Sequence, residues 1–173
     1  RPGEVLVARA VQADGDQAWT SPLFIRGEWQ PPGLLITEVL PAPREVDFNG
    51  DGLRDSNDEF IELHNPLGRP VGLGGWQLDD ADRGSRPFTL PIGTTIPPRG
   101  YLVFHKSATG VALDQIGDHA RLIAPDGTLV DDVSWPRFPG YDRSLSRTRA
   151  GSWISGAAPS PGGPLPEPPA EDG

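Results

Sequence analysis

Short apolar runs separated by glycine- and proline-rich turns recur along most of the chain. The strongest runs are LLITEVL at 34–40, EFIELHN at 59–65 and YLVFH at 101–105. No segment carries apolar residues at helical spacing over several turns. Short strands with turn signals at intervals of about 8–12 residues are typical of a β-sandwich. The pattern therefore predicts an all-β fold of two packed sheets.

The run EFIELHN alternates between its two faces. Successive side chains of a strand point to opposite sides of the sheet. Ile61 and Leu63 are therefore expected on one face. Phe60, Glu62 and His64 are expected together on the other face.

Turn signals lie between the predicted strands. The segment ARLIAPDGTLVDDVSW predicts a hairpin that reverses at PDG, residues 125–127. The pair GG at 74–75 allows a bend that delivers Trp76 into a core. The segment PPRG at 97–100 predicts a turn that leads into the strand at 101–105.

The pattern divides the chain into three parts. Residues 1–30 contain two β-like runs around DG at 14–15, and we expect a hairpin left from an upstream domain, followed by a linker. Residues 34–164 form the predicted sandwich. Residues 165–173 are proline-rich and are expected to be a disordered tail.

Composition narrows the function classes. A net charge of −9 disfavours general binding to nucleic-acid backbones, which needs a basic surface. The absence of cysteine excludes disulfides and thiolate metal sites. No apolar run is long enough to span a membrane, and no signal peptide is recognised. Because the chain opens with Arg1 and contains no methionine, we expect a fragment or a processed product.

The stretch DFNGDGLRDSND at 47–58 is the strongest candidate site. Its spacing is that of an EF-hand-type calcium loop, with oxygen ligands at positions 1, 3, 5, 7, 9 and 12 and glycine at position 6. The candidate ligands are Asp47, Asn49, Asp51, the backbone carbonyl of Leu53, Asp55, Asp58 and Glu59.

Two features of this loop depart from the EF-hand pattern. Position 12 is Asp58 instead of glutamate, as in the dockerin variant that the loop resembles, and Glu59 is the alternative residue to close the shell. The loop also joins two predicted strands, not two helices. We therefore expect a structural Ca²⁺ that fixes the crossing between strands, with a solvated acidic turn as the alternative.

A second candidate is a segment near the C-terminus that mixes aromatic and basic residues. Such mixtures bind sugars or single strands. Its candidate ligand-surface residues are Trp135, Arg137, Tyr141 and Arg143. The alternative is that these aromatics pack on the sandwich and the arginines pair with the acidic surface.

Catalytic residues are not predicted. The three histidines stand at no metal-ligand spacing, and the chain has no nucleophile motif. The segment GLGG at 72–75 precedes a strand and so is no phosphate-binding loop.

The stretches LLITEVL, EFIELHNPLGRPVGLGGWQLDD, FTLPIGTTIPPRGYLVF and RLIAPDGTLVDDVSW resemble the lamin tail domain family, in the order that family shows. The resemblance covers residues 34–164 and implies an immunoglobulin-like β-sandwich. The segment ARAVQADGDQAWTSPLFI resembles the end of polymerase-and-histidinol-phosphatase-type phosphoesterases. Metal ligands of such an enzyme would lie upstream of this chain.

The family resemblance implies a module that binds or attaches and does not catalyse. The bacterial members it resembles are accessory modules of secreted or cell-surface proteins, so we expect an extracellular or surface location in bacteria. The expected partner is a protein, a polysaccharide or another cell-surface ligand, and the isolated chain is expected to be monomeric. Two alternatives stay open: an accessory portion of an extracellular metal-dependent phosphoesterase or nuclease, and a filament-tail or DNA-associated module.

Overall fold

A computed structural model describes residues 33–81 and 84–166, together with the backbone of four short strands near the N-terminus. The chain divides into two units, Arg1–Gln30 and Pro31–Gly173. The turn at 14–15 and residues 167–173 of the expected tail lie outside the described residues.

The first unit is built from two antiparallel strand pairs. β1 (Glu4–Leu6) pairs with β4 (Leu23–Ile25), and β2 (Arg9–Val11) pairs with β3 (Gln17–Trp19).

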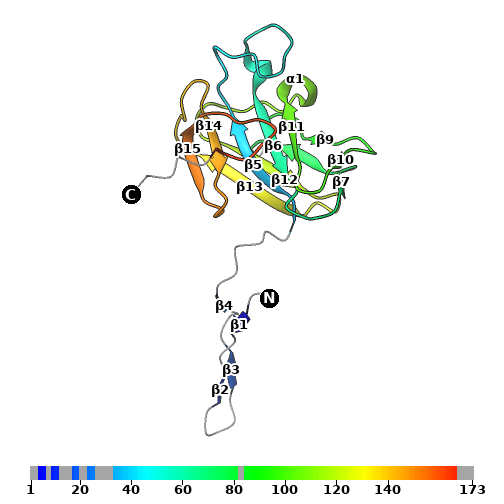
Figure 1. Cartoon of the computed structure of the whole chain (residues 1–173), viewed down its shortest axis with the longest axis vertical. Coiled ribbons are helices and arrows are strands. Elements are labelled where there is room, and N and C mark those ends of the chain that lie inside the picture. Colours follow the sequence, from blue (N-terminus) through cyan, green and yellow to red (C-terminus); the bar gives the residue numbers. More distant parts are fainter. Residues whose placement is uncertain are drawn as a thin grey trace. The chain divides into compact units, whose positions relative to one another are not determined.

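The second unit contains two main antiparallel sheets (Figure 1). The five-stranded sheet has the order β11 (Tyr101–His105), β6 (Phe60–His64), β5 (Leu35–Leu40), β14 (Ser144–Arg147) and β15 (Trp153–Ala157). The four-stranded sheet has the order β13 (Leu129–Trp135), β12 (Asp118–Ile123), β8 (Gln77–Asp79) and β9 (Phe88–Thr89). A small pair joins β10 (Thr95–Ile96) to β7 (Val71–Gly72), and the helices are one-turn α1 (Lys106–Thr109) and 3₁₀ η1 (Ser56–Asp58). The predicted all-β, immunoglobulin-like sandwich is confirmed.

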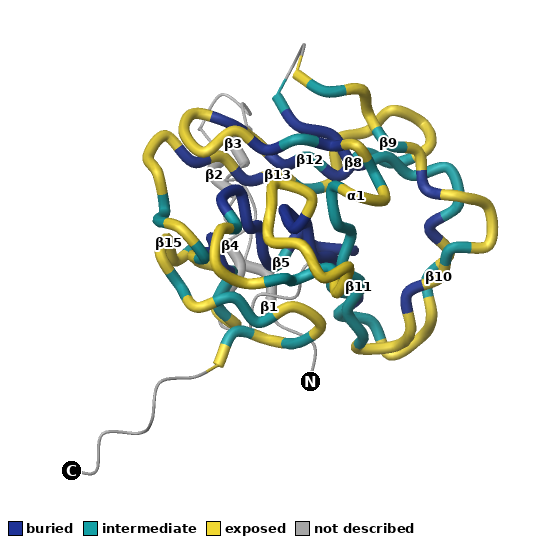
Figure 2. Tube along the Cα trace, turned by 90° about the horizontal axis from the view of Figure 1, so that it is seen from above, coloured by how far each residue is buried: buried dark blue, intermediate teal, exposed yellow. Residues whose placement is uncertain are grey.

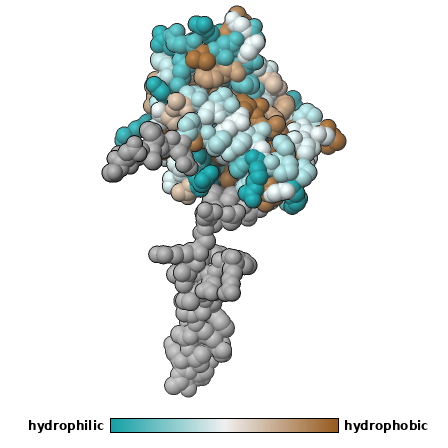
Figure 3. All heavy atoms as spheres, viewed as in Figure 1, coloured by the Kyte–Doolittle hydropathy of each residue, from teal (hydrophilic) through white to brown (hydrophobic). Residues whose placement is uncertain are grey.

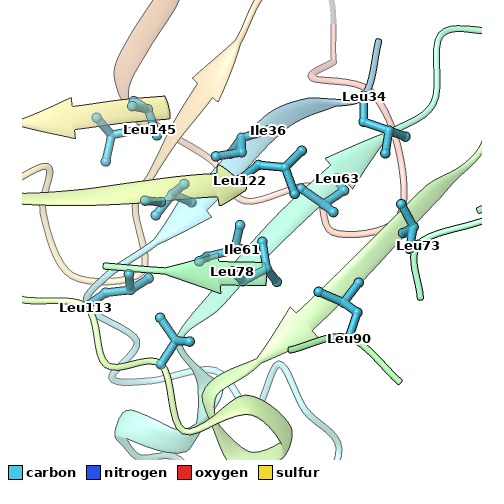
Figure 4. Close-up of a cluster of buried hydrophobic side chains, with 14 of the residues drawn as sticks. Leu34, Ile36, Ile61, Leu63, Leu73, Leu78, Leu90, Leu113, Leu122 and Leu145 are labelled. Carbon is cyan, nitrogen blue, oxygen red and sulfur yellow. The ribbon is translucent and has the colours of Figure 1, made fainter. Parts of the chain in front are cut away.

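The core lies between the two main sheets (Figure 4). Alternation places it there: in β12, residues 118, 120 and 122 are buried, and the positions between them are more exposed. Both sheets supply its fully buried side chains, which include Ile36, Val39, Ile61, Leu63, Leu78, Leu122 and Trp135.

The turns predicted at GG, residues 74–75, and at PPRG, residues 97–100, are both present. Gly75 adopts φ 84°, and the Trp76 amide donates to the carbonyl of Leu73, so the bend places Trp76 against the core. The Gly100 amide donates to the carbonyl of Pro97 directly before β11. A Cβ at Gly100 would stand 2.4 Å from the Pro97 ring, so this turn accepts only glycine without rearrangement.

Figure 2 shows buried residues, in dark blue, inside the second unit and exposed residues, in yellow, mainly in its outer loops. Strand β6 is buried on both faces, although its sequence alternates. Ile61 and Leu63 face the core as predicted. On the opposite face Phe60 is covered by Phe48 of the β5–β6 loop, with ring centroids 6.0 Å apart. Glu62 is 1 % exposed because residues 158–163, the C-terminal strap, cross it.

Two buried carboxylates hold the C-terminal strap. Glu38 accepts the Ser160 amide at 2.9 Å and the hydroxyls of Ser144 and Ser146 at 2.6 and 2.9 Å. Glu62 accepts the Gly162 amide at 2.6 Å. Side chains of β5 and β6 thus fix a segment that lies about a hundred residues further along the chain.

Asp131 of β13 ties the two main sheets together. Its Oδ2 atom accepts the backbone amide of Ile36 at 2.8 Å. Both of its oxygens accept Nη2 of Arg147, at 2.8 and 2.7 Å. Because β14 pairs with β5 only at residues 38 and 39, the carboxylate takes the place of a ladder partner for Ile36.

Replacing Asp131 with alanine is expected to lower the free energy of unfolding by about 2–4 kcal/mol, because it leaves the buried Ile36 amide without its acceptor and removes the buried ion pair with Arg147. Urea denaturation measures the change. Asp132→Ala, on the same strand but exposed, serves as the control and should change stability by less than about 0.5 kcal/mol. Equal effects of the two substitutions would contradict the role of Asp131.

Glu62 makes the sandwich sensitive to pH. The pKa of its carboxyl is raised from 4.5 to about 7, and burial is the main cause. Hydrogen bonds from Thr37 and Gly162 oppose the rise, and the nearby charge of Glu38 adds to it. The folded state therefore holds this proton more tightly than the unfolded state. The resulting stabilisation is complete below pH 4.5 and is lost as the pH rises through 7.

Glu62→Gln is expected to remove this pH dependence and to raise stability at pH 8, by up to roughly 3 kcal/mol at about 1.4 kcal/mol per pKa unit. The glutamine amide can accept from Gly162 and donate to the Thr37 hydroxyl, so the strap contacts survive. Thermal melts at pH 5 and pH 8 test this, with exposed Glu45→Gln as the matched control. A Glu62→Gln protein that melts lower than the parent at pH 8 would refute the explanation.

Candidate metal site

The β5–β6 loop carries the candidate calcium ligands and extends from the end of the sandwich beside α1 (Figure 1). Asp47 organises its first half, because Oδ1 accepts the Gly50 amide at 2.7 Å and Oδ2 accepts the Gly52 amide at 2.8 Å. Gly52 has φ 88°, a conformation that favours glycine, as the calcium-loop pattern requires at position 6. The Gly52 hydrogen bond is the main cause that lowers the pKa of Asp47, so this carboxylate stays charged.

Three residues in the middle of the loop make the same local hydrogen bond. Asn49, Asp51 and Asp55 each use Oδ1 to accept the amide two residues ahead, at 2.9, 2.8 and 2.7 Å. Each such bond orients a side-chain oxygen along the inside of a turn. Asp51, Leu53 and Asp55 are exposed, so their ligand groups are accessible to an ion from solvent.

Asp58 closes the loop from its buried end. Its Oδ1 atom accepts the amides of Phe48 and Asn49 at 2.8 and 2.9 Å, and Oδ2 accepts the Asp55 amide at 3.0 Å. Asp58 is fully buried. These bonds occupy three of the roughly four acceptor positions of a carboxylate, so one remains for a cation.

Glu59 points out of the loop. Its Oε1 atom accepts Nζ of Lys106 at 3.0 Å, and Oε2 accepts the Leu113 amide at 2.8 Å. Burial raises the pKa of Glu59, although both hydrogen bonds oppose that shift. Of the two residues proposed to complete the ligand shell, Asp58 lies within the loop and Glu59 ties it to the chain around α1.

The donor set fits a hard cation, but the side chains are not gathered at one point. Within residues 33–81 and 84–166, no three histidine, aspartate or glutamate side chains form a group able to hold a metal ion. The loop concentrates like charges, and like charges repel when no ion lies between them. Convergence of Asp47, Asp51 and Asp58 would therefore have to accompany binding.

The second candidate, the aromatic and basic surface, is only partly at the surface. Trp135 is 1 % exposed and donates its indole N–H to the carbonyl of Asp114, so its assignment to a ligand surface is wrong. It ends β13 on the core face, where a large ring fills the sandwich. Arg137, Tyr141 and Arg143 are exposed as expected.

Two residues outside the four candidates join this surface: Phe138, which belongs to the same aromatic and basic segment, and Arg44, which sequence reasoning missed. Phe138 is exposed and meets Tyr141 edge to face, with centroids 5.0 Å apart. The guanidinium of Arg44, from the β5–β6 loop, lies 4.7 Å from the Tyr141 ring centroid. Asp142 completes the link, because its carboxylate accepts the Arg44 amide at 2.9 Å. Sequence reasoning could not place Arg44 on this surface, because Arg44 lies almost a hundred residues from Tyr141 along the chain.

Apolar and hydrophilic residues are interspersed over the face of the second unit that Figure 3 shows. In the part of the chain that the structure describes, both helices are single turns, and neither is long or apolar enough to cross a bilayer.

The sequence model of the lamin tail domain family matches residues 30–137. That range runs from β5 to β13 and includes the calcium-loop candidate, whereas β14, β15 and the C-terminal strap lie beyond it. No curated protein matches the chain. The family comprises immunoglobulin-like, non-catalytic domains that act in protein interaction. Because the match covers more than half of the sequence and the fold agrees with it, the chain belongs to the lamin tail domain family.

Proposed function

We propose that the chain is a calcium-stabilised binding or attachment module, and that its β5–β6 loop holds one structural Ca²⁺. The observation that carries the calcium part is the arrangement of loop oxygens at the six liganding positions. Asp47, Asn49, Asp51 and Asp55 each accept backbone amides that orient their oxygens, and these bonds leave further lone pairs for an ion.

Asp58, not Glu59, is the residue proposed to close the shell. Glu59 is already bound on both oxygens by Lys106 and Leu113. Asp58 accepts amides from both ends of the loop, so an ion beside it would bring the two halves together. Bound Ca²⁺ would also offset the repulsion among the carboxylates.

The proposed role of calcium is structural because the end of the loop is tied to α1. The 3₁₀ helix η1 contacts α1, and Lys106 of α1 binds Glu59 directly after the loop. Ordering of residues 47–58 would thereby order α1 and the end of β11. A secreted or cell-surface location agrees with this role, since moderate calcium sites of extracellular modules have dissociation constants of about 10⁻⁴–10⁻³ M.

Calcium binding by the β5–β6 loop is expected to be lost or weakened at least tenfold by Asp51→Asn. The asparagine keeps the oxygen that accepts the Leu53 amide and removes only the charge. Asp126→Asn is the matched control, because Asp126 is also exposed and accepts the Thr128 amide at 2.9 Å in a hairpin turn. Calorimetric titration measures affinity, and melting with and without chelator measures stabilisation.

The control protein should bind calcium and gain melting temperature like the parent. No heat of binding to the parent protein, together with no melting shift on chelation, would refute the calcium proposal. Equal calcium affinity in the Asp51→Asn and Asp126→Asn proteins would refute its placement in this loop.

The surface around Tyr141 is the proposed ligand contact of the module. Phe138 and Tyr141 present exposed aromatic rings, and the nearby Arg137 and Arg143 form no ion pair within the described residues. The Arg44 guanidinium lies over the Tyr141 ring, and a guanidinium on an aromatic face suits acidic sugars, which offer both carboxylates and apolar ring faces.

Tyr141→Ala is expected to abolish binding to acidic glycans on a glycan array while the fold stays intact by circular dichroism. Ile92→Ala, which changes an exposed side chain at a distant turn, is the control and should bind as the parent does. An array on which the parent protein binds no acidic glycan would exclude this ligand class. Unchanged binding by the Tyr141→Ala protein would exclude this surface.

A further inference from the structure

A second acidic site lies in the four-stranded-sheet half of the sandwich, apart from the calcium-loop candidate. It is a cavity of about 350 Å³ between residues 80, 81, 84 and 85 on one side and the segment 112–118 on the other. Its described lining includes Asp80, Ser85, Ala112, Asp114, Gly117 and Asp118. Three of its described lining residues are aspartates and none is basic, so the described lining is anionic.

The carboxylate of Asp118 braces the two segments. Its Oδ1 atom accepts the amides of Ala81 and His119 at 3.1 and 2.7 Å, and its Oδ2 atom accepts the Asp114 amide at 2.7 Å. Asp118 is 5 % exposed. The Ala112 amide adds a second tie between the segments by donating to the Ser85 hydroxyl at 3.2 Å. The walls of the cavity are thus held in place by bonds across it.

Asp80 is the described lining residue that keeps a buried oxygen without a hydrogen-bond donor. It is 3 % exposed, and its Oδ2 atom accepts the Ser85 amide at 2.6 Å. Its Oδ1 atom is the only buried side-chain oxygen among the described residues that meets no hydrogen-bond donor. A buried carboxylate oxygen without a partner costs free energy unless a cation, a donor or a proton meets it.

The backbone leaves room for this carboxylate. A Cβ at Gly84 would overlap both oxygens of Asp80, so the residue at this position of the wall has to be glycine for the carboxylate to lie there. The cavity itself is large enough for several waters, since one water occupies about 30 Å³ of liquid. Space for an ion with part of its hydration shell is therefore present beside Asp80.

We propose that this cavity binds one hydrated divalent cation through Asp80, with Asp118 and Asp114 supplying further negative charge. Because no three acidic side chains converge as a metal-binding group in the described residues, carbonyl and water oxygens complete the shell. Calcium and magnesium both accept such mixed oxygen ligands, and magnesium keeps several waters. The site is independent of the calcium loop, since the two share no residue.

The test measures how many ions bind to each molecule of the full chain. Equilibrium dialysis with calcium, and separately with magnesium, compares the parent protein with its Asp51→Asn, Asp80→Asn and doubly substituted forms. Asp51→Asn disables the loop and should leave one ion bound per chain. Asp80→Asn should remove the cavity ion only, because its amide oxygen can still accept from Ser85. The double form should bind neither ion.

Terbium luminescence supplies a second readout when the loop is disabled by Asp51→Asn. The Trp135 indole N–H donates to the carbonyl of Asp114 at 2.8 Å, so a terbium ion in the cavity lies near a tryptophan that can sensitise its emission. This emission should persist in the Asp51→Asn protein and disappear in the doubly substituted protein. Persistence of the emission in the doubly substituted protein would overturn the proposal.

A second variant covers the case in which Asp80→Asn fails to fold. Asp114 is exposed and uses its backbone amide, not its side chain, to reach Asp118, so Asp114→Asn keeps the brace. This substitution should weaken the binding of the cavity ion at least threefold. An Asp51→Asn protein that binds neither calcium nor magnesium would overturn the cavity site. If instead one bound ion is lost when Asp80→Asn is introduced, the cavity site is supported, whether or not the loop binds calcium.

Discussion

The rest of the structure depends on buried carboxylates that accept backbone amides from distant segments. Strands of two to seven residues leave many amides without ladder partners, and buried amides must be paired. Aspartates and glutamates supply the missing acceptors. Glu38 and Glu62 hold the C-terminal strap, Asp131 joins the sheets, Asp58 closes the β5–β6 loop, and Glu59 ties that loop to the chain around α1. In a chain without cysteine these contacts fix the loops that disulfides fix elsewhere.

This use of carboxylates links stability, acidity and cation binding. A buried carboxylate stabilises the loop that it binds, but burial also penalises its charge, and the raised pKa values of Glu59 and Glu62 record that penalty. Cations relieve the same penalty from outside the chain. The two proposed ion sites lie where carboxylates are already oriented by amides. In these sites a cation would meet carboxylates as backbone amides do in the loops. The acidic residues that give the net charge of −9 therefore have a structural role as well as an effect on solubility.

Local patterns predicted much of the fold. The run YLVFH is the strand at 101–105, and the PDG turn joins β12 to β13. The spacing of the acidic loop predicted candidate ligand oxygens, but could not separate Asp58 from Glu59, because only the positions of Lys106 and the Leu113 amide show that Glu59 is bound outside the loop. The long-range contacts escaped prediction. The residues near Glu62 in the sequence do not indicate that the C-terminal strap buries it. The spacing of the aromatic residues likewise did not show that Trp135 faces the core.

Amide hydrogen exchange of the intact chain, read residue by residue, tests the role of the buried carboxylates most directly. We predict that the amides of Ile36, Phe48, Leu113 and Gly162 exchange as slowly as those in the central strands, although most lie in loops, because buried carboxylates hold them. Exchange of these four amides at the rate of the exposed turn around Asp126 would contradict that role.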